Sequence, residues 1–255
     1  MEQIEFYKKI EETYKQKEKA LVGTITAIEG NNNFEFDPMG TKILLRQEDR
    51  LTYPANRLKL WQMIMDNIVN VDQLMDSKFP ILKKVKIDSG IEVEVYFEPV
   101  LEEPRLLIFG AGHVAKPLAK VGKMVDFTVT VMDDRQDMVS RQRYPQADEL
   151  VCADFDDYLR NLQIKENDYL VIVTRGHKHD YEVLKEVIDS QAKYIGMIGS
   201  SRKVKMLFRQ LRDEGVGQEL IDQVYAPIGV NIASETPAEI AMSIIAEIIS
   251  IRREE

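Results

Sequence analysis

The segment Arg105–Ala115 constrains the fold of this 255-residue chain more than any other. Its apolar run, Leu106–Phe109, leads directly into a Gly-Ala-Gly turn at Gly110 to Gly112, and a helical pattern of apolar residues begins at His113. A buried parallel strand, a glycine turn and a helix N-terminus follow in this order in dinucleotide-binding βαβ units. Gly110 would permit the turn, and Gly112 has no Cβ, so a pyrophosphate could approach the backbone. The free N–H groups of the helix N-terminus would face that anion.

Residues 105–255 continue with short apolar strands that alternate with helical patterns. We expect these strands at residues 106–109, 127–132, 150–153, 169–174, 194–198 and 224–228. Near the end of the chain, Thr236, Pro237 and Glu239 have the spacing of a capping box and predict a final helix. This alternation predicts an α/β, doubly wound (Rossmann-type) domain, in which a parallel sheet of strand order 3-2-1-4-5 is covered by helices on both faces.

Residues 1–98 predict a separate, small α+β domain, and the proline-bracketed acidic segment 99–104 predicts a linker. Helices are expected over 2–19 and 54–71, and strands over 21–28, 41–46, 82–87 and 91–97. An apolar stripe of the first helix should face the core; it comprises Ile4, Tyr7, Ile10 and Tyr14. The last two strands alternate apolar and charged residues, which predicts an antiparallel hairpin with one face in water.

The composition excludes several classes of partner. The hydrophobic content of 44% and the charged content of 30% are those of a soluble globular protein. A net charge of −9 disfavours nucleic acid and an anionic membrane surface as partners. No apolar run approaches the ~20 residues of a membrane span, and the N-terminus lacks the apolar core of a signal peptide, so we expect a cytoplasmic protein. The single cysteine, Cys152, excludes an intrachain disulfide, and its place in the third strand predicts a small buried side chain.

Asp133 is the first candidate ligand contact outside the glycine turn. It stands 23 residues after Gly110, at the end of the second strand, where a carboxylate hydrogen-bonds the ribose of a dinucleotide. Arg135 could instead receive the 2′-phosphate of NADP, so the choice between NAD and NADP stays open. The structural alternative for Asp133 is a solvated strand end or a helix cap.

The segment Thr174–Asp180 brings cationic and imidazole side chains to the end of the fourth strand. In the expected order the first and fourth strands are neighbours, so Arg175, His177 and His179 should lie opposite His113. Arg175 would contact an anion, and the imidazoles would serve as acids, bases or polar contacts. The alternatives are a polar loop that caps the next helix, or a metal bound by the two histidines and the aspartate. Since the loop offers no further committed ligand, we predict no metal site.

A third candidate site follows the fifth strand. Ser200, Ser201 and Arg202 stand after Gly199 at the start of a predicted helix. Hydroxyl groups and a cation at a helix N-terminus can bind an anion. An ordinary serine-capped helix with exposed basic residues explains the same residues equally well. Under the expected strand order, this loop would extend the crevice formed by the loops after the first and fourth strands.

These motifs together resemble those of the xanthine dehydrogenase accessory protein family of XdhC/CoxI type. They run in order over residues 105–250 and comprise Leu106–Ala115, Asp133–Arg135, Val173–His177, Ile195–Lys203, Pro227–Gly229 and Thr236–Ala241. The first domain departs from the family pattern. Its segment Gly40–Leu45 is similar to a family strand, but Glu29–Phe34 replaces a Gly-Ser-Ser-Pro-like segment, and the family's Gly-Gly-Cys turn has no counterpart in the sequence.

The resemblance implies an accessory or maturation factor for a molybdenum hydroxylase of the xanthine dehydrogenase type, not itself a catalyst. Such a factor binds the molybdenum cofactor or a related nucleotide, hands it to the apoenzyme and forms a homodimer; members are sometimes labelled xanthine dehydrogenase by association. The predicted binding residues are Gly110, Gly112, His113, Asp133, Arg175, His177, Ser200, Ser201 and Arg202. Two other functions fit the same residues: an NAD(P)-dependent oxidoreductase with His113 or His177 as proton donor, and a nucleotide-sensing regulatory module.

Overall fold

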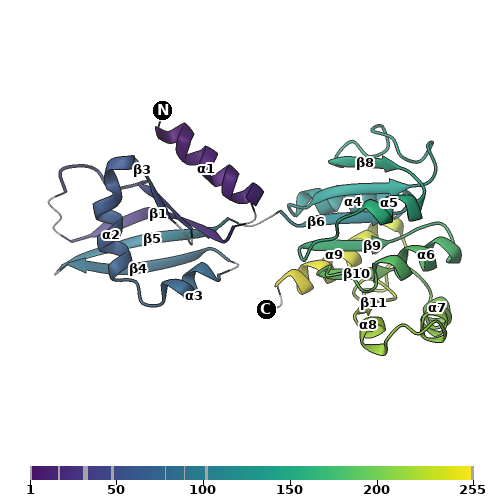
Figure 1. Ribbon diagram of the computed structural model, residues 1–255. Helices are drawn as coiled ribbons and strands as arrows, with labels where there is room; N and C mark the ends of the chain where they lie inside the picture. Colours follow the sequence, from purple (N-terminus) through teal and green to yellow (C-terminus); the bar gives the residue numbers. More distant parts are fainter. Residues whose placement is uncertain are drawn as a thin grey trace. The chain divides into compact units, whose positions relative to one another are not determined.

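The computed structural model describes residues 2–16, 18–30, 34–46, 49–77, 79–88, 90–100 and 103–253. The chain forms two compact units, residues 1–102 (unit 1) and residues 103–255 (unit 2), shown in Figure 1. The division falls inside the segment 99–104 that the sequence predicts as a linker. Unit 1 contains an antiparallel sheet and unit 2 a parallel one, which confirms the predicted fold class.

Unit 1 is a five-stranded antiparallel sheet in the order β3-β2-β1-β5-β4, with helices packed against it. Its elements are α1 (Glu2–Gln16), β1 (Ala20–Glu29), β2 (Lys42–Arg46), β3 (Arg50–Tyr53), η1 (Ala55–Arg57), α2 (Leu58–Asp66), α3 (Val71–Met75), β4 (Ile81–Asp88) and β5 (Ile91–Pro99). The core lies between α2 and the sheet, where Trp61 and Ile64 pack in one cluster with Val93 and Phe97. The predicted hairpin is confirmed, since β4 pairs with β5 antiparallel.

The buried face of α1 differs from the predicted apolar stripe. Ile4 and Tyr7 are 64% and 48% exposed, whereas Phe6 and Thr13 are buried. The face of α1 that packs against the rest of unit 1 therefore runs through Phe6, Ile10 and Thr13, which also follow helical spacing. Thr13 fits this face because its hydroxyl donates to the backbone oxygen of Lys9 at 2.8 Å, so no polar group is left unpaired.

The single helix predicted over 54–71 is shorter in the structure: it consists of η1 and α2, which ends at Asp66, and the next helix, α3, begins at Val71. Pro54 has an extended ψ of 151° and precedes the 3-10 turn η1, so it does not occupy a first α-helical position. Asn70 has a φ of 62° and separates α2 from α3. A left-handed residue cannot continue a right-handed helix, so the apolar periodicity overestimates the length of this helix.

Unit 2 is a six-stranded parallel sheet in the order β11-β10-β9-β6-β7-β8. Its elements are β6 (Arg105–Phe109), α4 (Ala115–Met124), β7 (Thr128–Asp133), β8 (Glu149–Cys152), α5 (Phe155–Asn161), β9 (Asp168–Ile172), α6 (His177–Val187), β10 (Tyr194–Met197), α7 (Ser201–Asp213), α8 (Gln218–Asp222), β11 (Val224–Tyr225) and α9 (Pro237–Arg253). Numbered from β6, this is the predicted order 3-2-1-4-5 with the sixth strand added at the edge.

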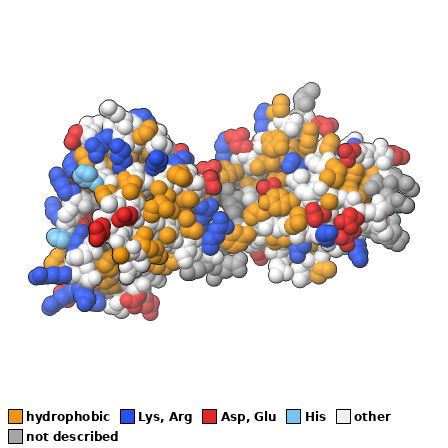
Figure 2. Space-filling model, turned by 180° about the vertical axis from the view of Figure 1, so that it is seen from behind, with side chains coloured by type: hydrophobic (Ala, Val, Ile, Leu, Met, Phe, Trp, Pro, Cys, Tyr) orange, Lys and Arg blue, Asp and Glu red, His pale blue; other side chains and the backbone are white. Residues whose placement is uncertain are grey.

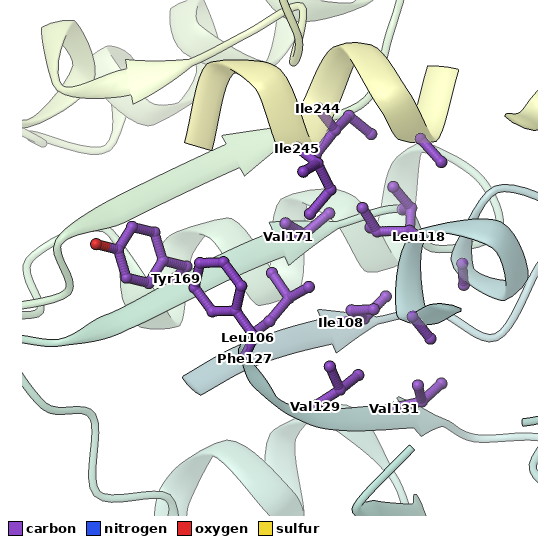
Figure 3. Packing of buried hydrophobic residues seen from close by; sticks show 14 of the residues in the cluster. Leu106, Ile108, Leu118, Phe127, Val129, Val131, Tyr169, Val171, Ile244 and Ile245 are labelled. Carbon is purple, nitrogen blue, oxygen red and sulfur yellow. The ribbon is translucent and has the colours of Figure 1, made fainter. Parts of the chain in front are cut away.

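Helices cover both faces of this sheet, and each face has its own core. Leu106, Ile108 and Val171 point to the face covered by α4 and α9, where Figure 3 shows them with Leu118 and Ile244. The alternate sheet residues, such as Leu107 and Phe109, belong to the core beneath α5, α6 and α7. The described part of the chain, α9 included, contains no helix long and apolar enough to cross a membrane.

Cys152 is exposed, which corrects the prediction of a buried side chain. The reason is the position of its strand. β8 is the outermost strand at one side of the sheet; its two end residues are exposed and its two middle residues are half-buried. Cys152 is the last residue of that strand, so neither face of the sheet covers it.

Candidate functional site

Three loops of unit 2 lie side by side at the carboxyl edge of the parallel sheet. They follow β6, β9 and β10, which are neighbouring strands. Hydrogen bonds join them just beyond the strand ends: the Val173 amide donates to the Phe109 carbonyl at 2.8 Å, and the Ile198 amide donates to the Ile172 carbonyl at 2.9 Å. The loops that carry Gly110, Arg175 and Ser200 are therefore adjacent, as the strand order predicts.

The two glycines of the turn have different roles. Gly110 has a φ of 109°, and a Cβ at this position would lie 2.4 Å from the carbonyl oxygen of Val173. Only glycine fits there, because the turn lies directly against the loop after β9. At Gly112 a Cβ would meet no atom within 4 Å. Gly112 therefore leaves open space beside the start of α4, which begins at Ala115, two residues later than predicted.

Asp133 holds the glycine turn in place. Its side chain is buried, and its Oδ2 accepts a hydrogen bond of 2.7 Å from the backbone N–H of Ala111. Arg135 donates to the same carboxylate from its backbone N–H, Nε and Nη2 at 3.0, 2.8 and 2.9 Å. Burial by itself raises the pKa of the Asp133 carboxyl, but the hydrogen bonds from Arg135 and Ala111 outweigh it and lower the pKa to about 2.

Asp133 and Arg135, which the sequence predicts as contacts for a ribose or a 2′-phosphate, bind to each other and to the glycine turn. The Asp133 carboxylate accepts four hydrogen bonds from Ala111 and Arg135. The Arg135 guanidinium is bound to Asp133, and a carboxylate oxygen of Asp134 lies 3.8 Å from its Nε. Contact of either residue with a ligand stays a prediction, and their observed contacts orient the turn.

A buried ion pair joins the loops after β9 and β10. Asp180, in the first turn of α6, is fully buried and forms an ion pair with Lys203 of α7. The other oxygen of Asp180 accepts hydrogen bonds from the Thr174 amide at 3.2 Å and the Thr174 hydroxyl at 2.6 Å. Lys203 also donates to the Ile198 carbonyl at 3.2 Å. The pair therefore fixes both loops at the edge of the sheet.

The three histidines do not share one environment. His113 and His177 are exposed, and Figure 2 shows histidine side chains on the surface of unit 2 near lysine and arginine side chains. His179 instead lies 5.3 Å from the Phe155 ring of α5, and its Nδ1 is 3.0 Å from Glu182. Since α6 begins at His177, His179 is rotated by about 200° around the helix axis relative to it. The sequence pattern did not predict that α6 starts so early.

The loop after β10 combines a helix cap with exposed polar side chains. The Ser200 hydroxyl accepts a hydrogen bond of 3.3 Å from the Lys203 amide, so the serine cap is confirmed. Ser201 and Arg202 are exposed in the first turn of α7, and Arg175 is exposed in the neighbouring loop. Within the described residues neither arginine forms an ion pair, so two cations of this edge face water without a carboxylate partner.

Sequence reasoning did not identify the Asp180–Lys203 pair. It treated Asp180 as a possible metal ligand and gave Lys203 no partner within the chain. The signal in the sequence was an aspartate in the first turn of one predicted helix and a lysine three residues after the cap of the next. Among the described residues, no group of three histidine, cysteine, aspartate or glutamate side chains is arranged to hold a metal ion.

Sequence comparison relates this chain to known proteins, and the family match lies within unit 2. Residues 106–248, more than half of the chain, match the family model described as XdhC Rossmann domain. "Uncharacterized protein YqeB" of Escherichia coli (strain K12) is 33% identical over 166 residues, which are 65% of this chain and 30% of that protein. A probable xanthine dehydrogenase subunit of Bacillus subtilis (strain 168) is 31% identical over 159 residues, 62% of this chain and 46% of that protein. The chain thus spans less than half the length of both relatives.

A solved structure shares the fold of the chain. It is the crystal structure of a xanthine dehydrogenase from Bacillus halodurans, with a TM-score of 0.56 and 19% sequence identity. The match covers 97% of this chain and 96% of that one, so it includes residues of unit 1 as well as unit 2. At this level of identity the likeness shows the fold alone.

Proposed function

This chain belongs to the XdhC family, and from that premise we propose that it is an accessory factor for a molybdenum hydroxylase of the xanthine dehydrogenase type. It binds the molybdenum cofactor, or a related nucleotide, at the carboxyl edge of the parallel sheet and passes it to the apoenzyme. In this proposal the chain acts as a cytoplasmic homodimer and is not itself the catalyst. The similarity to the Bacillus subtilis protein, a probable xanthine dehydrogenase subunit, supports a connection with that enzyme.

The observation that carries the proposal is the arrangement of the family motifs. Motifs that are far apart in the sequence lie on adjoining loops after β6, β9 and β10, at one edge of the sheet. In open α/β sheets, ligands bind outside the carboxyl ends of the strands, where the strand order reverses. The reversal here lies between β6 and β9, beside Gly110 and Val173.

The residues at this edge fit a cofactor that carries phosphate groups. A Cβ at Gly112 would project into open space at the start of α4, so the missing side chain leaves room for a ligand. Helix N-termini favour anions, because their first N–H groups have no partner within the helix. The exposed guanidinium groups of Arg175 and Arg202 add positive charge on the neighbouring loops.

Each residue has a distinct part in binding. The backbone at Gly112 and the N-terminus of α4 would hold the phosphate groups, and Arg175 and Arg202 would neutralise their charge. His113 and His177, both exposed, would donate hydrogen bonds to polar groups of the ligand. When bound, the molybdenum cofactor supplies the redox centre of the hydroxylase; this chain binds and orients it.

The experiment is an activation assay with the apo form of the partner dehydrogenase, a limiting supply of molybdenum cofactor and the purified full chain. We expect the wild-type chain to accelerate the appearance of dehydrogenase activity. The Arg175→Gln/Arg202→Gln variant should slow this activation by about tenfold or more, because two exposed cations that contact the phosphate are removed. The control is Arg160→Gln/Arg209→Gln, which removes two arginines whose side chains are 71% and 80% exposed on α5 and α7.

A chain that binds neither molybdopterin nor any nucleotide, and has no effect on activation, would refute the proposal. Oxidation of NADH with a panel of small carbonyl substrates tests the main rival, an NAD(P)-dependent oxidoreductase. Turnover that depends on His113 or His177 would establish that rival instead.

A further inference from the structure

A pocket of unit 2 lies on the outer side of α4. Its volume is about 400 Å³, and it lies between the exposed side of that helix and the segment that precedes β8. Lys116 and Lys120 of α4 form one wall, because residues four apart share a helix face. Arg143, Gln142 and Gln146 face them, and two prolines complete the lining.

The charge of this pocket is positive and unpaired. Its lining contains three cations, Lys116, Lys120 and Arg143, and no carboxylate. None of the three forms an ion pair with any residue that the structure describes. The chain as a whole carries a net charge of −9, so the local charge of this pocket is opposite in sign to that of the chain. Such a cluster attracts anions and favours multiply charged ones.

Arg143 connects the pocket to the glycine turn. Its Nε is buried and has no hydrogen-bond partner within the described residues. Its guanidinium also interacts with the hydroxyl of Tyr144, which donates to the Gly112 carbonyl at 3.4 Å. Burial raises the pKa of the Tyr144 hydroxyl to about 12 against the opposing effect of Arg143, so the tyrosine stays a neutral donor. Tyr144 therefore links Arg143 of the pocket to the turn that we propose as the cofactor site.

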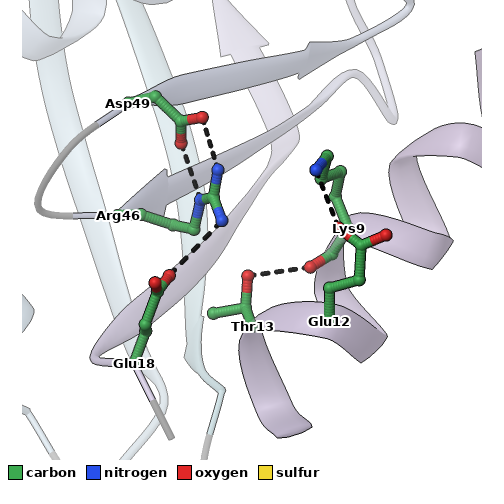
Figure 4. A network of polar contacts seen from close by, with 6 residues as sticks. All are labelled: Lys9, Glu12, Thr13, Glu18, Arg46 and Asp49. Atoms are coloured by element: carbon green, nitrogen blue, oxygen red, sulfur yellow. Dashed lines mark hydrogen bonds and ion pairs between the residues drawn. The ribbon is translucent and has the colours of Figure 1, made fainter. Parts of the chain in front are cut away.

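A pocket of unit 1 has a different charge pattern. Its volume is about 450 Å³, and it is lined by three basic and three acidic side chains. Four of these six charges are paired: Arg46 binds Asp49 and also Glu18, as Figure 4 shows, and Lys19 lies 2.7 Å from Asp76. Paired charges offer an anion little net attraction, so this pocket does not compete with the one on α4.

We propose that the pocket formed by Lys116, Lys120 and Arg143 binds a phosphate dianion. Two lysines and an arginine supply the donors that a phosphate dianion accepts, and the amides of Gln142 and Gln146 add neutral donors. The phosphate has two sources: inorganic phosphate, or a phosphate monoester of a dinucleotide whose diphosphate lies on the glycine turn. The second source rests on the proposed function, and the first does not.

The test is titration calorimetry of the full chain with three probes: inorganic phosphate, NAD+ and NADP+. The last two differ by one phosphate monoester, so they report whether that group contributes. The variant is Lys116→Gln/Lys120→Gln; both lysines are exposed, so the fold should survive. The control is Lys59→Gln/Lys193→Gln, which removes two exposed lysines that do not line the pocket.

We expect wild-type chain to bind inorganic phosphate with a Kd below about 1 mM, and the pocket variant to weaken this by about tenfold or more. The control should bind as wild type does. If NADP+ also binds about tenfold more tightly than NAD+, and the pocket variant abolishes that difference, the phosphate belongs to a nucleotide. If NAD+ and NADP+ bind equally tightly, or neither binds, and inorganic phosphate still binds, the source of the phosphate is the free anion.

Two results would overturn the inference: no phosphate binding by the wild-type chain, or equal phosphate binding by wild type and the pocket variant. The proposed function fails separately. If the chain binds phosphate in this pocket but neither a nucleotide nor molybdopterin, the pocket is a phosphate site and the cofactor role is lost. The Gly112→Asp variant separates failure of the pocket inference from failure of the proposed function. It should block the glycine turn and leave the binding of inorganic phosphate to the pocket within about twofold of wild type.

Discussion

Two groups of charged residues in unit 2 are built in opposite ways. At the carboxyl edge of the sheet, Asp133 and Asp180 are buried, and each is paired with a cation and with backbone N–H groups. In the pocket on α4, Lys116 and Lys120 are exposed and have no carboxylate partner among the described residues.

The difference separates charges that shape the protein from charges that bind ligands. A buried carboxylate loses its hydration, so it is stable only where donors replace the water. Asp133 and Asp180 meet this condition by holding the glycine turn and two neighbouring loops. An exposed lysine stays hydrated and keeps its charge available for an anion. Substitutions should therefore affect stability in the first group and binding in the second.

The largest effect is expected at the buried pair. Asp180→Asn removes the negative charge next to Lys203 and leaves that ammonium group without its partner, so the free energy of unfolding should fall by about 4 kcal/mol. Urea unfolding at neutral pH measures this. Asp189→Asn, which neutralises an exposed carboxylate at the end of the α6 region, serves as the control and should change stability by less than about 0.5 kcal/mol.

The double variant Asp180→Asn/Lys203→Met sharpens that result. Because it removes both charges, it should be less destabilised than the sum of its two single variants. If the stability loss of the double variant equals the sum of the losses of the two single variants, the two side chains do not act as a pair. The contrast between the two groups of charged residues would then be lost.

The two glycines of the turn should respond differently to alanine. Gly110→Ala places a Cβ against the Val173 carbonyl at a φ of 109°, which should cost roughly 3 kcal/mol of stability. Gly112→Ala meets no atom within 4 Å, so its stability should change by less than about 1 kcal/mol. Thermal unfolding of both variants gives the comparison directly. Equal losses would mean that the turn does not pack against the loop after β9.

The pH dependence of stability should contain a contribution from Asp133. Its pKa is lowered from 3.8 to about 2 in the folded chain, so the ionised form stabilises the fold. This contribution, about 2 kcal/mol, is fully present well above the unfolded pKa and is lost as the pH falls from about 4 to about 2. The stability difference between wild type and Asp133→Asn should shrink over this range, as urea unfolding at several pH values would show. A constant difference would contradict the assignment.

The smallest effect is expected at the pocket on α4. Lys116→Gln/Lys120→Gln removes two exposed charges that repel each other and have no described partner, so its unfolding free energy should stay within about 0.5 kcal/mol of wild type. Urea unfolding checks this alongside the binding experiments. A large loss of stability would show that these lysines have a structural role, as Asp133 and Asp180 have at the carboxyl edge of the sheet.

The strand order of unit 2 was predictable from sequence, whereas the partners of its buried charges were not. Parallel strands are buried on both faces, so Leu106–Phe109 and its neighbours stand out as apolar runs. Asp133 meets the amide of Ala111 across 22 positions, and Asp180 meets Lys203 across 23. Sequence spacing shows that a carboxylate stands at a strand end, but the donor it meets depends on how the loops fold.

The sequence predicted the outline of unit 1 correctly, but some details of that prediction were wrong. Its strands follow from alternation, which is a local pattern. In α1, however, two sets of residues have helical spacing, and the buried set contains a polar residue, Thr13. Choosing between the two faces requires knowing that the Thr13 hydroxyl bonds to Lys9, a contact within the helix that composition does not reveal.

The central claim is that the glycine turn at the carboxyl edge of the parallel sheet binds a phosphate-bearing cofactor. The test is titration calorimetry of the full chain with NADH, NADPH and molybdopterin, carried out on the wild type and on the Gly112→Asp variant. The matched control is Gly217→Asp, since a Cβ at Gly217 also meets no atom within 4 Å. We predict that at least one of these ligands binds the wild type and the control, and binds Gly112→Asp about a hundredfold more weakly. Equal binding by all three proteins, or no binding by any, would contradict the account.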